Sequence, residues 1–156
     1  MGAFALKQIR KGTRLIEYVG LRISKREAAR QCNSGNTFIF TLNDREDLDG
    51  SVKWNPARFI NHSCDPNAEA EQNEDDHVFI TAARTIRPGE EITFNYGYDF
   101  SAYRDNPCAC GAANCLGFIT AAEYHGRVRR ILEAERKKQA ATRKAPPRRP
   151  QSRKKK

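Results

Sequence analysis

Four cysteines constrain the fold of this chain more than any other residues. Three of them, Cys108, Cys110 and Cys115, form a Cys-x-Cys-x4-Cys cluster, and the fourth, Cys64, lies well upstream. Four thiolates fill the tetrahedral sphere of a zinc ion and leave no position for water, which makes such a site structural. Four unrelated free thiols would leave the Cys-x-Cys spacing without a cause. We therefore predict a structural zinc ion that holds the segment 108–115 against the loop around Cys64.

The length of 156 residues allows one domain with a hydrophobic core, plus an extension. No apolar run approaches the roughly 18 residues that a membrane span needs, and the N-terminus lacks the apolar stretch of a signal peptide. Cysteines in such a chain favour reduced thiols or a bound metal over disulfides. The fifth cysteine, Cys32, is expected to be an ordinary packed or surface thiol.

The net charge of +9 is distributed unevenly along the chain. Residues 1–120 hold 14 Lys/Arg and 16 Asp/Glu, whereas residues 121–156 hold 14 and 3. An acidic body suits a Lys/Arg-rich partner, and a basic extension suits nucleic acid or an acidic partner. Residues 141–156 contain eight Lys/Arg, no acid and no large apolar residue. We expect this tail to be disordered and to contact phosphates without sequence preference; a plain solubilising tail is the alternative.

Short segments rich in β-forming residues predict a mainly β domain. The predicted strands cover residues 13–19, 37–42, 78–83 and 91–94. A short helix over 25–32 follows a capping box formed by Ser24 and Glu27. The polar stretch 43–50 and the acidic run 69–76 are expected to be a turn and a solvated loop, although the acidic run could also dock a basic peptide.

A longer helix is predicted over residues 121–140. Thr120 and Glu123 form a second capping box before it. The apolar residues that follow at helical spacing are Tyr124, Val128, Ile131 and Leu132. This spacing places them on one face of an otherwise basic helix.

Three motifs resemble those of the SET-domain protein-lysine methyltransferases. They are Arg-Phe-Ile-Asn-His-Ser-Cys (58–64), Gly-Glu-Glu-Ile-Thr-Phe-Asn-Tyr-Gly (89–97) and the cysteine cluster 108–115, which matches the post-SET zinc motif. The resemblance implies a SET fold of small curved β-sheets, with a pseudoknot in which the C-terminal segment passes under a loop. It divides the chain into a SET domain (1–107), a post-SET segment (108–119), a basic helix (120–140) and the tail (141–156).

The same resemblance implies methyl transfer from S-adenosylmethionine to the ε-amine of a lysine in a histone or histone-like protein. Tyr96 matches the catalytic tyrosine, and Tyr18 would line the lysine channel. Phe94 occupies a position where the family has Phe or Tyr. A Tyr there holds a water and favours a single methylation, whereas Phe lets methyl groups displace that water. We therefore predict di- or trimethylation.

The resemblance also assigns residues to the two bound groups. The donor would contact Gly2, Phe4, Asn61, His62, Tyr96 and Phe118. Zinc would be held by Cys64, Cys108, Cys110 and Cys115. The family usually begins with Gly-x-Gly before an aromatic residue, and here Gly2 matches the second glycine. His77 and His125 are expected on a surface loop and a helix face.

Two other functions are compatible with the sequence. The chain could be a catalytically weak SET-like module that binds nucleic acid or a partner through its tail. It could also methylate a non-chromatin substrate such as a ribosomal protein. The expected location is intracellular: the bacterial cytoplasm or nucleoid, or the nucleus and chromatin of a host if the protein is an effector.

Overall fold

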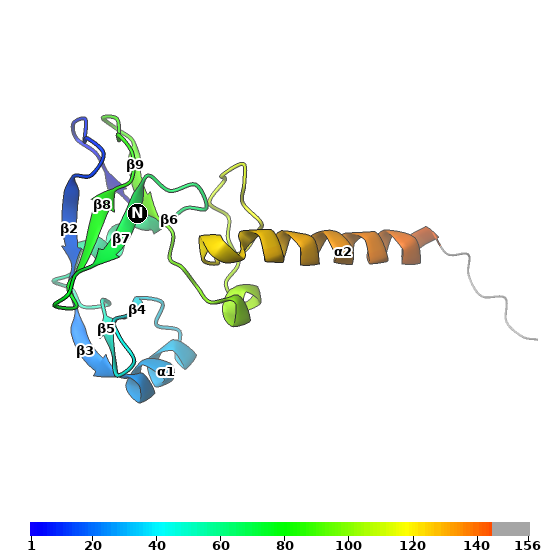
Figure 1. Cartoon of the computed structure of the whole chain (residues 1–156), viewed down its shortest axis with the longest axis horizontal. Coiled ribbons are helices and arrows are strands. Elements are labelled where there is room, and N and C mark those ends of the chain that lie inside the picture. The colour runs from blue at the N-terminus through cyan, green and yellow to red at the C-terminus, as the bar shows by residue number, and fades with distance from the viewer. Residues whose placement is uncertain (145–156) are drawn as a thin grey trace, which may run out of the picture. The chain divides into compact units, whose positions relative to one another are not determined.

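The computed structural model describes residues 1–144, with side chains described as far as residue 142 (Figure 1). The chain divides into two compact units, Met1–Ala122 and Glu123–Lys156. In its described part, the first unit consists of three small three-stranded sheets and one short α-helix. The mainly β architecture predicted from the sequence is confirmed.

The first sheet contains the best-buried strand of the molecule. Its order is β2 (Arg14–Tyr18), β8 (Val78–Ala82) and β7 (Ala68–Gln72), all antiparallel. Val78 and Ile80 of the central strand are completely buried, and Ala68 of β7 packs in the same cluster. Tyr18, at the C-terminal end of β2, belongs to the same buried cluster.

The second sheet carries the helix α1 (Lys25–Asn33) directly after its first strand. Its order is β3 (Leu21–Ser24), β5 (Glu46–Asp49) and β4 (Ile39–Thr41). The hydroxyl of Ser24 accepts a hydrogen bond from the Glu27 backbone N–H at 3.3 Å. The Ser24 half of the predicted capping box is therefore present. The Glu27 carboxylate instead accepts from Arg30 and from Gln31, each at 2.9 Å.

The third sheet brings two of the sequence motifs together. Its order is β1 (Ala3–Phe4), β9 (Glu91–Phe94) and β6 (Asn61–His62). β6 runs parallel to β9, with His62 beside Phe94. Parallel neighbours need a long crossover connection, and here the β7–β8 hairpin supplies it. The pseudoknot threading stays a prediction.

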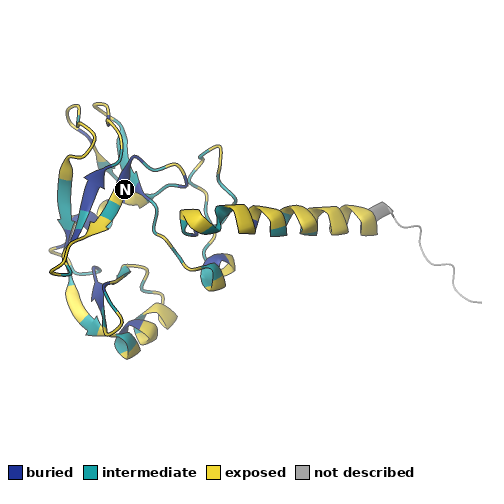
Figure 2. Ribbon diagram, viewed as in Figure 1, coloured by how far each residue is buried: buried dark blue, intermediate teal, exposed yellow. Residues whose placement is uncertain are grey.

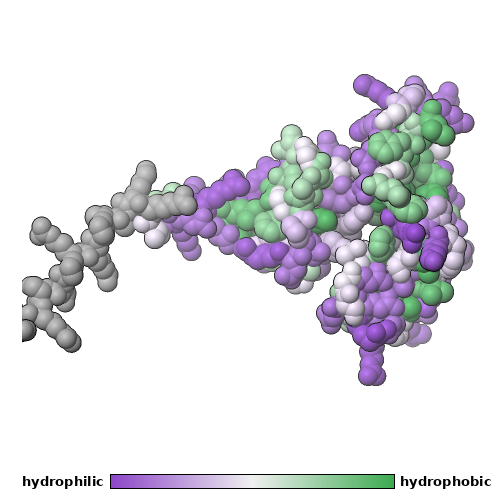
Figure 3. Space-filling view, turned by 180° about the vertical axis from the view of Figure 1, so that it is seen from behind, coloured by the Kyte–Doolittle hydropathy of each residue, from purple (hydrophilic) through white to green (hydrophobic). Residues whose placement is uncertain are grey.

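Four further helical segments complete the described chain. They are the 3₁₀ turns η1 (Pro56–Phe59), η2 (Phe100–Asp105) and η3 (Ala122–Tyr124), and the helix α2 (His125–Lys144). α2 is largely exposed and mostly hydrophilic (Figures 2 and 3). Among the described residues, no helix is both long and apolar enough to cross a membrane.

The predicted polar turn over 43–50 is wrong, because β5 lies within it. Its two aspartates are buried and paired. The Asp47 carboxylate binds the Lys25 ammonium at 2.6 Å, and the Asp49 carboxylate accepts from the Asn36 amide at 3.0 Å. The two carboxylates thus find hydrogen-bond partners far away in the sequence. The local sequence shows only their polarity, which is typical of a loop.

The predicted loop over the acidic run 69–76 is wrong in its first half. Glu69 and Glu71 lie in β7 with exposed side chains. Ala68 and Ala70 alternate with them and pack on the core. Alternation of small apolar and acidic residues is the pattern of a half-buried strand. The prediction considered the acidic residues alone and therefore missed this alternation.

The second helix begins and ends later than the sequence predicted. Thr120 does not cap it: the Thr120 hydroxyl donates to the Tyr98 carbonyl at 3.3 Å, and α2 starts at His125. The helix then continues to Lys144, so the first four residues of the predicted disordered tail are helical. The rest of that tail, 145–156, lies outside the described residues.

Candidate active site

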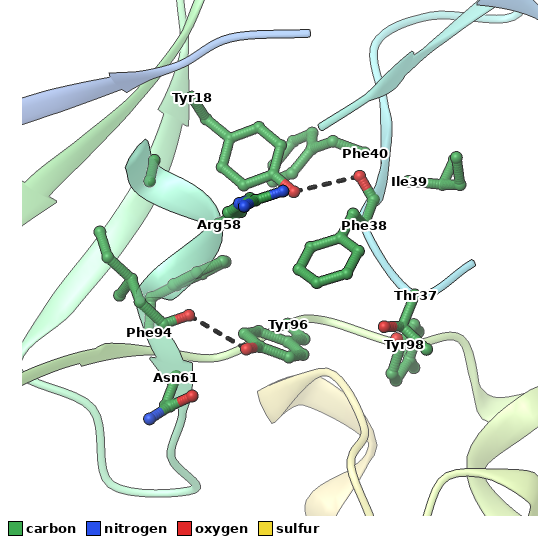
Figure 4. A pocket seen from close by; sticks show the side chains of 12 residues that line it. Tyr18, Thr37, Phe38, Ile39, Phe40, Arg58, Asn61, Phe94, Tyr96 and Tyr98 are labelled. Carbon is green, nitrogen blue, oxygen red and sulfur yellow. Dashed lines mark hydrogen bonds between the residues drawn. The ribbon is translucent and has the colours of Figure 1, made fainter. Parts of the chain in front are cut away.

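A pocket of about 150 Å³ lies among the ends of β2, β4 and β9. Six aromatic residues line it: Tyr18, Phe38, Phe40, Phe94, Tyr96 and Tyr98 (Figure 4). Among the described residues, the lining contains no carboxylate and one cationic side chain, Arg58. An aromatic passage of this size suits the aliphatic stem of a long side chain, with orientation supplied by a few polar groups.

The first polar group is the hydroxyl of Tyr18. The Tyr18 hydroxyl donates to the Phe38 carbonyl at 3.0 Å, and the Gly50 N–H donates to the same oxygen at 3.0 Å. A side chain at position 50 would collide with the Tyr18 ring, so a glycine is required there. Burial, followed by the nearby Tyr96, raises the pKa of Tyr18 above its ordinary value. Tyr18 is therefore a neutral phenol with oxygen lone pairs free of the Phe38 bond.

The second polar group is the hydroxyl of Tyr96. It donates to the Ile60 carbonyl at 3.0 Å, and this bond is drawn in Figure 4. Burial, followed by the neighbouring Tyr98, raises the pKa of Tyr96. Because the hydroxyl hydrogen is donated to the Ile60 carbonyl, the Tyr96 oxygen can still accept a hydrogen bond through its lone pairs. As a neutral phenol, Tyr96 is not a base at neutral pH.

Phe94 forms the buried wall between these groups. It is the last residue of β9, is 5% exposed, and its ring centroid lies 5.0 Å from that of Tyr96. The Phe94 side chain offers no hydroxyl to the pocket. The structure brings Tyr18, Phe94 and Tyr96 to one pocket. Their catalytic roles stay predictions.

The cysteine motif adjoins this pocket, because His62 contacts both Tyr96 and Cys64. Cys64 Sγ is 3.8 Å from Cys108 Sγ, and the Cys64 N–H donates to Cys110 Sγ at 3.4 Å. Two sulfur atoms bound to one tetrahedral zinc at about 2.3 Å lie about 3.8 Å apart. The spacing of Cys64 and Cys108 therefore fits shared coordination of one metal ion.

His62 also reaches this cluster, a role that the sequence analysis did not assign. One group of potential ligand atoms, all within 4.8 Å of one another, comprises His62, Cys64, Cys108 and Cys110. Nδ1 of His62 accepts from the Tyr96 N–H at 3.2 Å, and Nε2 lies 3.4 Å from Cys64 Sγ. A neutral imidazole that accepts at Nδ1 carries its proton on Nε2. His62 thus suits a hydrogen bond to the Cys64 sulfur better than a bond to a metal.

Cys115 stays the predicted fourth ligand, and its sulfur is not in the group of ligand atoms within 4.8 Å of one another. Its sulfur accepts from the Gly117 N–H at 3.4 Å and lies 3.9 Å from the Cys108 carbonyl oxygen. It is also near enough to act on the pKa of Cys64 and of Cys108. Gly117 has φ of 83°, a left-handed conformation that glycine favours, and this turn directs its N–H to the sulfur.

The thiol pKa values reflect crowding of the four sulfurs. Burial and then the neighbouring Cys110 raise the pKa of Cys64, and burial raises that of Cys108 to about 11. Burial also acts to raise the pKa of Cys110, but N–H donors from Cys64 and Ala112 lower it to about 6. Adjacent sulfurs cannot all ionise unless a cation joins them.

The residues predicted to bind the donor lie in two groups. Gly2 and Asn61 are neighbours, because a side chain at Gly2 would collide with Glu91 and approach the Asn61 amide. The Asn61 amide donates to the Met1 carbonyl at 3.0 Å and to the Glu91 carboxylate at 2.7 Å. Phe4 is 55% exposed.

Phe118 belongs to the second group, on the segment after the cysteine cluster. Its ring stands edge-on to that of Tyr103, with centroids 5.3 Å apart. It is half-buried, and the backbone beside it is fixed by the bond from the Cys108 N–H to the Gly117 carbonyl at 2.9 Å. Phe118 is thereby coupled to the position of the cysteines.

Two residues that shape the site were missed by the sequence analysis. Tyr98 lines the pocket, two residues beyond Tyr96, and that spacing was the available signal. Asn67 is 2% exposed and holds β9 with both ends of its amide. The amide donates to the Glu91 carbonyl at 2.7 Å and accepts from the Thr93 N–H at 2.9 Å. An isolated asparagine gives no sequence signal for this role.

Comparison with known proteins identifies relatives. Histone-lysine N-methyltransferase 2D of Homo sapiens is 36% identical over 124 residues, covering 74% of this chain and 2% of the relative. Histone-lysine N-methyltransferase ASHH1 of Arabidopsis thaliana is 35% identical over 129 residues, covering 77% and 26%. This chain thus corresponds to a small part of much longer proteins.

A solved structure shares the fold. It is a humanized mutant of the Chaetomium thermophilum Polycomb Repressive Complex 2 bound to the inhibitor GSK343. It aligns with a TM-score of 0.56 and 35% identity over 62% of this chain and 13% of that one. Residues 1–97 match the family described as SET domain. With its three small sheets, aromatic pocket and adjoining cysteine cluster, this chain belongs to the SET domain family.

Proposed function

We propose that this chain is an S-adenosylmethionine-dependent protein-lysine N-methyltransferase. The observation that carries the proposal is the aromatic pocket with two neutral tyrosine hydroxyls, each of which donates its proton to a backbone carbonyl. Such a pocket accepts the aliphatic stem of lysine and leaves oxygen lone pairs for the N–H groups of its amine. The curated relatives named above are histone-lysine N-methyltransferases.

The donor would be held by Gly2, Phe4, Asn61, His62, Tyr96 and Phe118. Gly2 fits a close-approach loop, because a side chain there would collide with Glu91. When bound, S-adenosylmethionine supplies a methyl group on a sulfonium for in-line displacement. The chain's part in the reaction is to align the amine with that methyl and to exclude water.

Tyr96 and Tyr18 would orient the amine without taking its proton. The raised pKa of both phenols keeps them protonated at neutral pH. The lysine must therefore lose its proton to solvent before transfer. Removing the charge of the ammonium favours entry into this pocket, since an unpaired charge is costly to bury and the lining already includes the Arg58 guanidinium.

Phe94 supports transfer of more than one methyl group. Its buried ring occupies the pocket wall beside Tyr96 without a hydroxyl. Water near Phe94 therefore gains no hydrogen bond from this side chain and is more easily displaced by a methylated amine. Di- and trimethylation are part of the proposal.

A structural zinc ion held by Cys64, Cys108, Cys110 and Cys115 also forms part of the proposal. It is supported by the 3.8 Å separation of two sulfurs and by the N–H donors to two others. Zinc would hold the Phe118 segment in place and would not contact the substrate. The boundary at residue 107 between SET and post-SET segments stays a prediction.

The proposed substrate is a Lys-rich histone or histone-like protein, at an intracellular location. The first unit is net acidic, which favours a basic substrate. Residues 141–156 would add non-specific contacts with nucleic acid phosphates. If catalysis is absent, the chain would instead be a binding module that acts through this basic segment.

A methyl-transfer assay tests the proposal directly. Zinc-loaded protein is incubated with labelled S-adenosylmethionine and a mixture of histones and bacterial histone-like proteins, and products are measured by intact mass. Methylated substrate, together with its loss in Tyr96→Phe, is the expected result. No transfer by folded, zinc-loaded protein, even with residues added before Met1, would refute the proposal in favour of the binding module.

A further inference from the structure

We propose that the helix α2 binds duplex DNA by contacts with backbone phosphates, through a face that carries Arg129, Arg136 and Lys137. These residues, at i, i+7 and i+8, lie on one side of the helix and precede the tail 141–156. DNA binding at this face is independent of methyl transfer in the pocket. Together with the proposed function, it narrows the substrates to basic proteins that are themselves bound to DNA.

α2 is an exposed helix rich in cations (Figure 2). Its six Lys/Arg with described side chains are all exposed; they are Arg127, Arg129, Arg130, Arg136, Lys137 and Lys138. The helix holds only two acids, Glu133 and Glu135. Among the described residues, Arg129, Arg136 and Lys137 have no ion-pair partner. Cations without partners repel one another, and a bound polyanion removes that repulsion.

The apolar residues of α2 lie on another side of the helix. Val128, Ile131 and Leu132 follow one another at i, i+3 and i+4, which places them in one stripe. Val128 is completely buried and the other two are half-buried, and no large apolar residue follows Leu132 in the helix. α2 therefore lacks the exposed apolar face that a membrane-surface helix inserts into lipid.

The side chains of α2 favour a duplex over a single strand. Only His125, at the first position of the helix, has a ring, whereas proteins that bind single strands stack bases on aromatic side chains. The helix has a single carboxamide, Gln139, the type of group that reads adenine in the major groove. We therefore expect contacts with phosphates that do not depend on base sequence.

The dimensions of α2 fit duplex DNA better than duplex RNA. The major groove of B-DNA is about 12 Å wide and admits an α-helix, whereas that of A-form RNA is too narrow. From Arg129 to Lys144 the helix is about 22 Å long, at about 1.5 Å per residue. B-DNA carries one charge per about 1.7 Å of its axis, so this length faces about a dozen phosphates.

Charge confines the DNA to one unit of the chain. Residues 121–156 hold 14 Lys/Arg and 3 Asp/Glu, whereas residues 1–120 hold 14 and 16. Phosphates are thus attracted to the unit with α2 and not to the pocket-bearing unit. The pocket stays available for a basic protein on the same DNA, and the effective concentration of that substrate rises.

The test measures binding of the full chain to a labelled duplex DNA by fluorescence anisotropy, over a range of salt concentrations. The variant with Arg129→Gln, Arg136→Gln and Lys137→Gln keeps a helix-forming side chain at each position. We expect its affinity to fall at least about 10-fold at about 0.1 M salt, and the slope of log K against log salt to lose about 0.9 for each phosphate contact removed. Circular dichroism should show unchanged helix content.

Matched variants separate the helix from the tail. Lys154→Gln, Lys155→Gln and Lys156→Gln together remove the same charge outside the described residues and should weaken binding less. Glu133→Gln removes an acid one turn from both Arg129 and Lys137 and should tighten binding. Equal losses in the helix and tail variants, or no gain in Glu133→Gln, would overturn the inference. Tighter binding to single-stranded DNA or duplex RNA, or equal displacement of DNA by poly-glutamate, would overturn the choice of duplex DNA.

A methyl-transfer readout keeps DNA binding distinct from the proposed function. With a free histone peptide the helix variant should match the wild type, because α2 is not part of the pocket lining. With histones assembled on DNA its rate should fall. Peptide methylation without DNA binding would overturn this inference alone, and DNA binding without peptide methylation would overturn the proposed function alone.

Discussion

The backbone N–H of Tyr96 donates to Nδ1 of His62 at 3.2 Å. The other nitrogen of the same imidazole lies 3.4 Å from Cys64 Sγ. One ring therefore connects the backbone of a pocket tyrosine to the cysteine cluster. We therefore expect a change in the state of the Cys64 sulfur to affect, through these two contacts, the residue that would orient the amine.

Removal of the proposed zinc ion should consequently abolish methyl transfer, even though the ion would not contact the substrate. Without a cation the crowded sulfurs repel one another when ionised, and the segments that they join separate. We expect a chelator to eliminate turnover and to increase hydrogen exchange in residues 100–119. Zinc added back should restore both, with one zinc per chain by elemental analysis.

Variants at Cys115 and His62 distinguish the two potential fourth ligands of the zinc ion. Cys115→Ser should reduce zinc content strongly, because Cys115 is the proposed ligand. His62→Gln should retain one zinc per chain while lowering turnover, since only the hydrogen bond between the pocket and the cluster is removed. Loss of zinc in His62→Gln with retention in Cys115→Ser would reverse the assignment.

Tyr96→Phe tests orientation by the hydroxyl. The variant removes the bond to the Ile60 carbonyl and the oxygen that would accept from the amine. We expect a fall in kcat of about 10²-fold, the scale of losing one oriented hydrogen-bonding group in an active site. KM for a peptide should change little. Equal loss of kcat in Tyr103→Phe, whose ring lies outside the pocket lining, would show that the effect is structural.

The pH dependence of turnover follows from the two raised tyrosine pKa values. Burial keeps the neutral phenol of Tyr18 and Tyr96 favoured beyond the ordinary pKa of 10. The rate should therefore rise with pH as the substrate amine loses its proton, with no decline from phenol ionisation below about pH 10. A descending limb near pH 8 in a stable, zinc-loaded enzyme would contradict this.

The site was predictable where one segment carries the signal. Two continuous motifs contain Cys64, Phe94 and Tyr96. The resemblance that places these motifs side by side was enough to predict that the three residues are close together. The link through His62 was not predictable, because it depends on the parallel pairing of β6 with β9 and on which ring nitrogen carries the proton. Neither property is encoded in the spacing of residues.

The fold shows the same division. Strands with strong β-forming residues, such as 91–94, were located correctly, whereas β5 was not. Asp47 and Asp49 make β5 polar, and only distant partners such as Lys25 explain their burial. Tertiary pairing thus overrode the local polar pattern. The Thr120 hydroxyl is a similar case: it bonds to the Tyr98 carbonyl, which is distant in the sequence, instead of capping a helix.

Phe94→Tyr should limit the number of methyl groups transferred. A hydroxyl added to this wall, beside Tyr96, can hold a water where a second methyl group would otherwise lie. We expect monomethylated product to accumulate with little change in the first transfer rate. The readout is a time course of peptide masses. Wild-type product that stops at one methyl would contradict the role of Phe94, whatever the variant does.

The acid stability of the fold should depend on Glu90. Its carboxylate binds the Arg84 guanidinium at 2.6 Å, accepts from the Arg87 N–H at 2.9 Å and accepts from the Asn67 amide at 3.1 Å. These contacts, Arg84 first, lower the pKa of Glu90 from 4.5 to about 2. A lowered folded-state pKa means that the stabilisation is complete above about pH 4.5 and disappears as pH falls toward 2.

Glu90→Gln should therefore lower the free energy of unfolding at pH 7 by about 1 kcal/mol, a value reduced for solvent screening at this partly exposed pair. The difference between wild type and variant should vanish by about pH 2. Urea unfolding of the metal-free proteins at each pH gives the two curves and avoids acid release of zinc. Arg84→Gln, alone and combined with Glu90→Gln, isolates the contribution of the ion pair. A difference between wild type and Glu90→Gln that stays constant from pH 7 to 2 would show that Glu90 acts by packing rather than by charge.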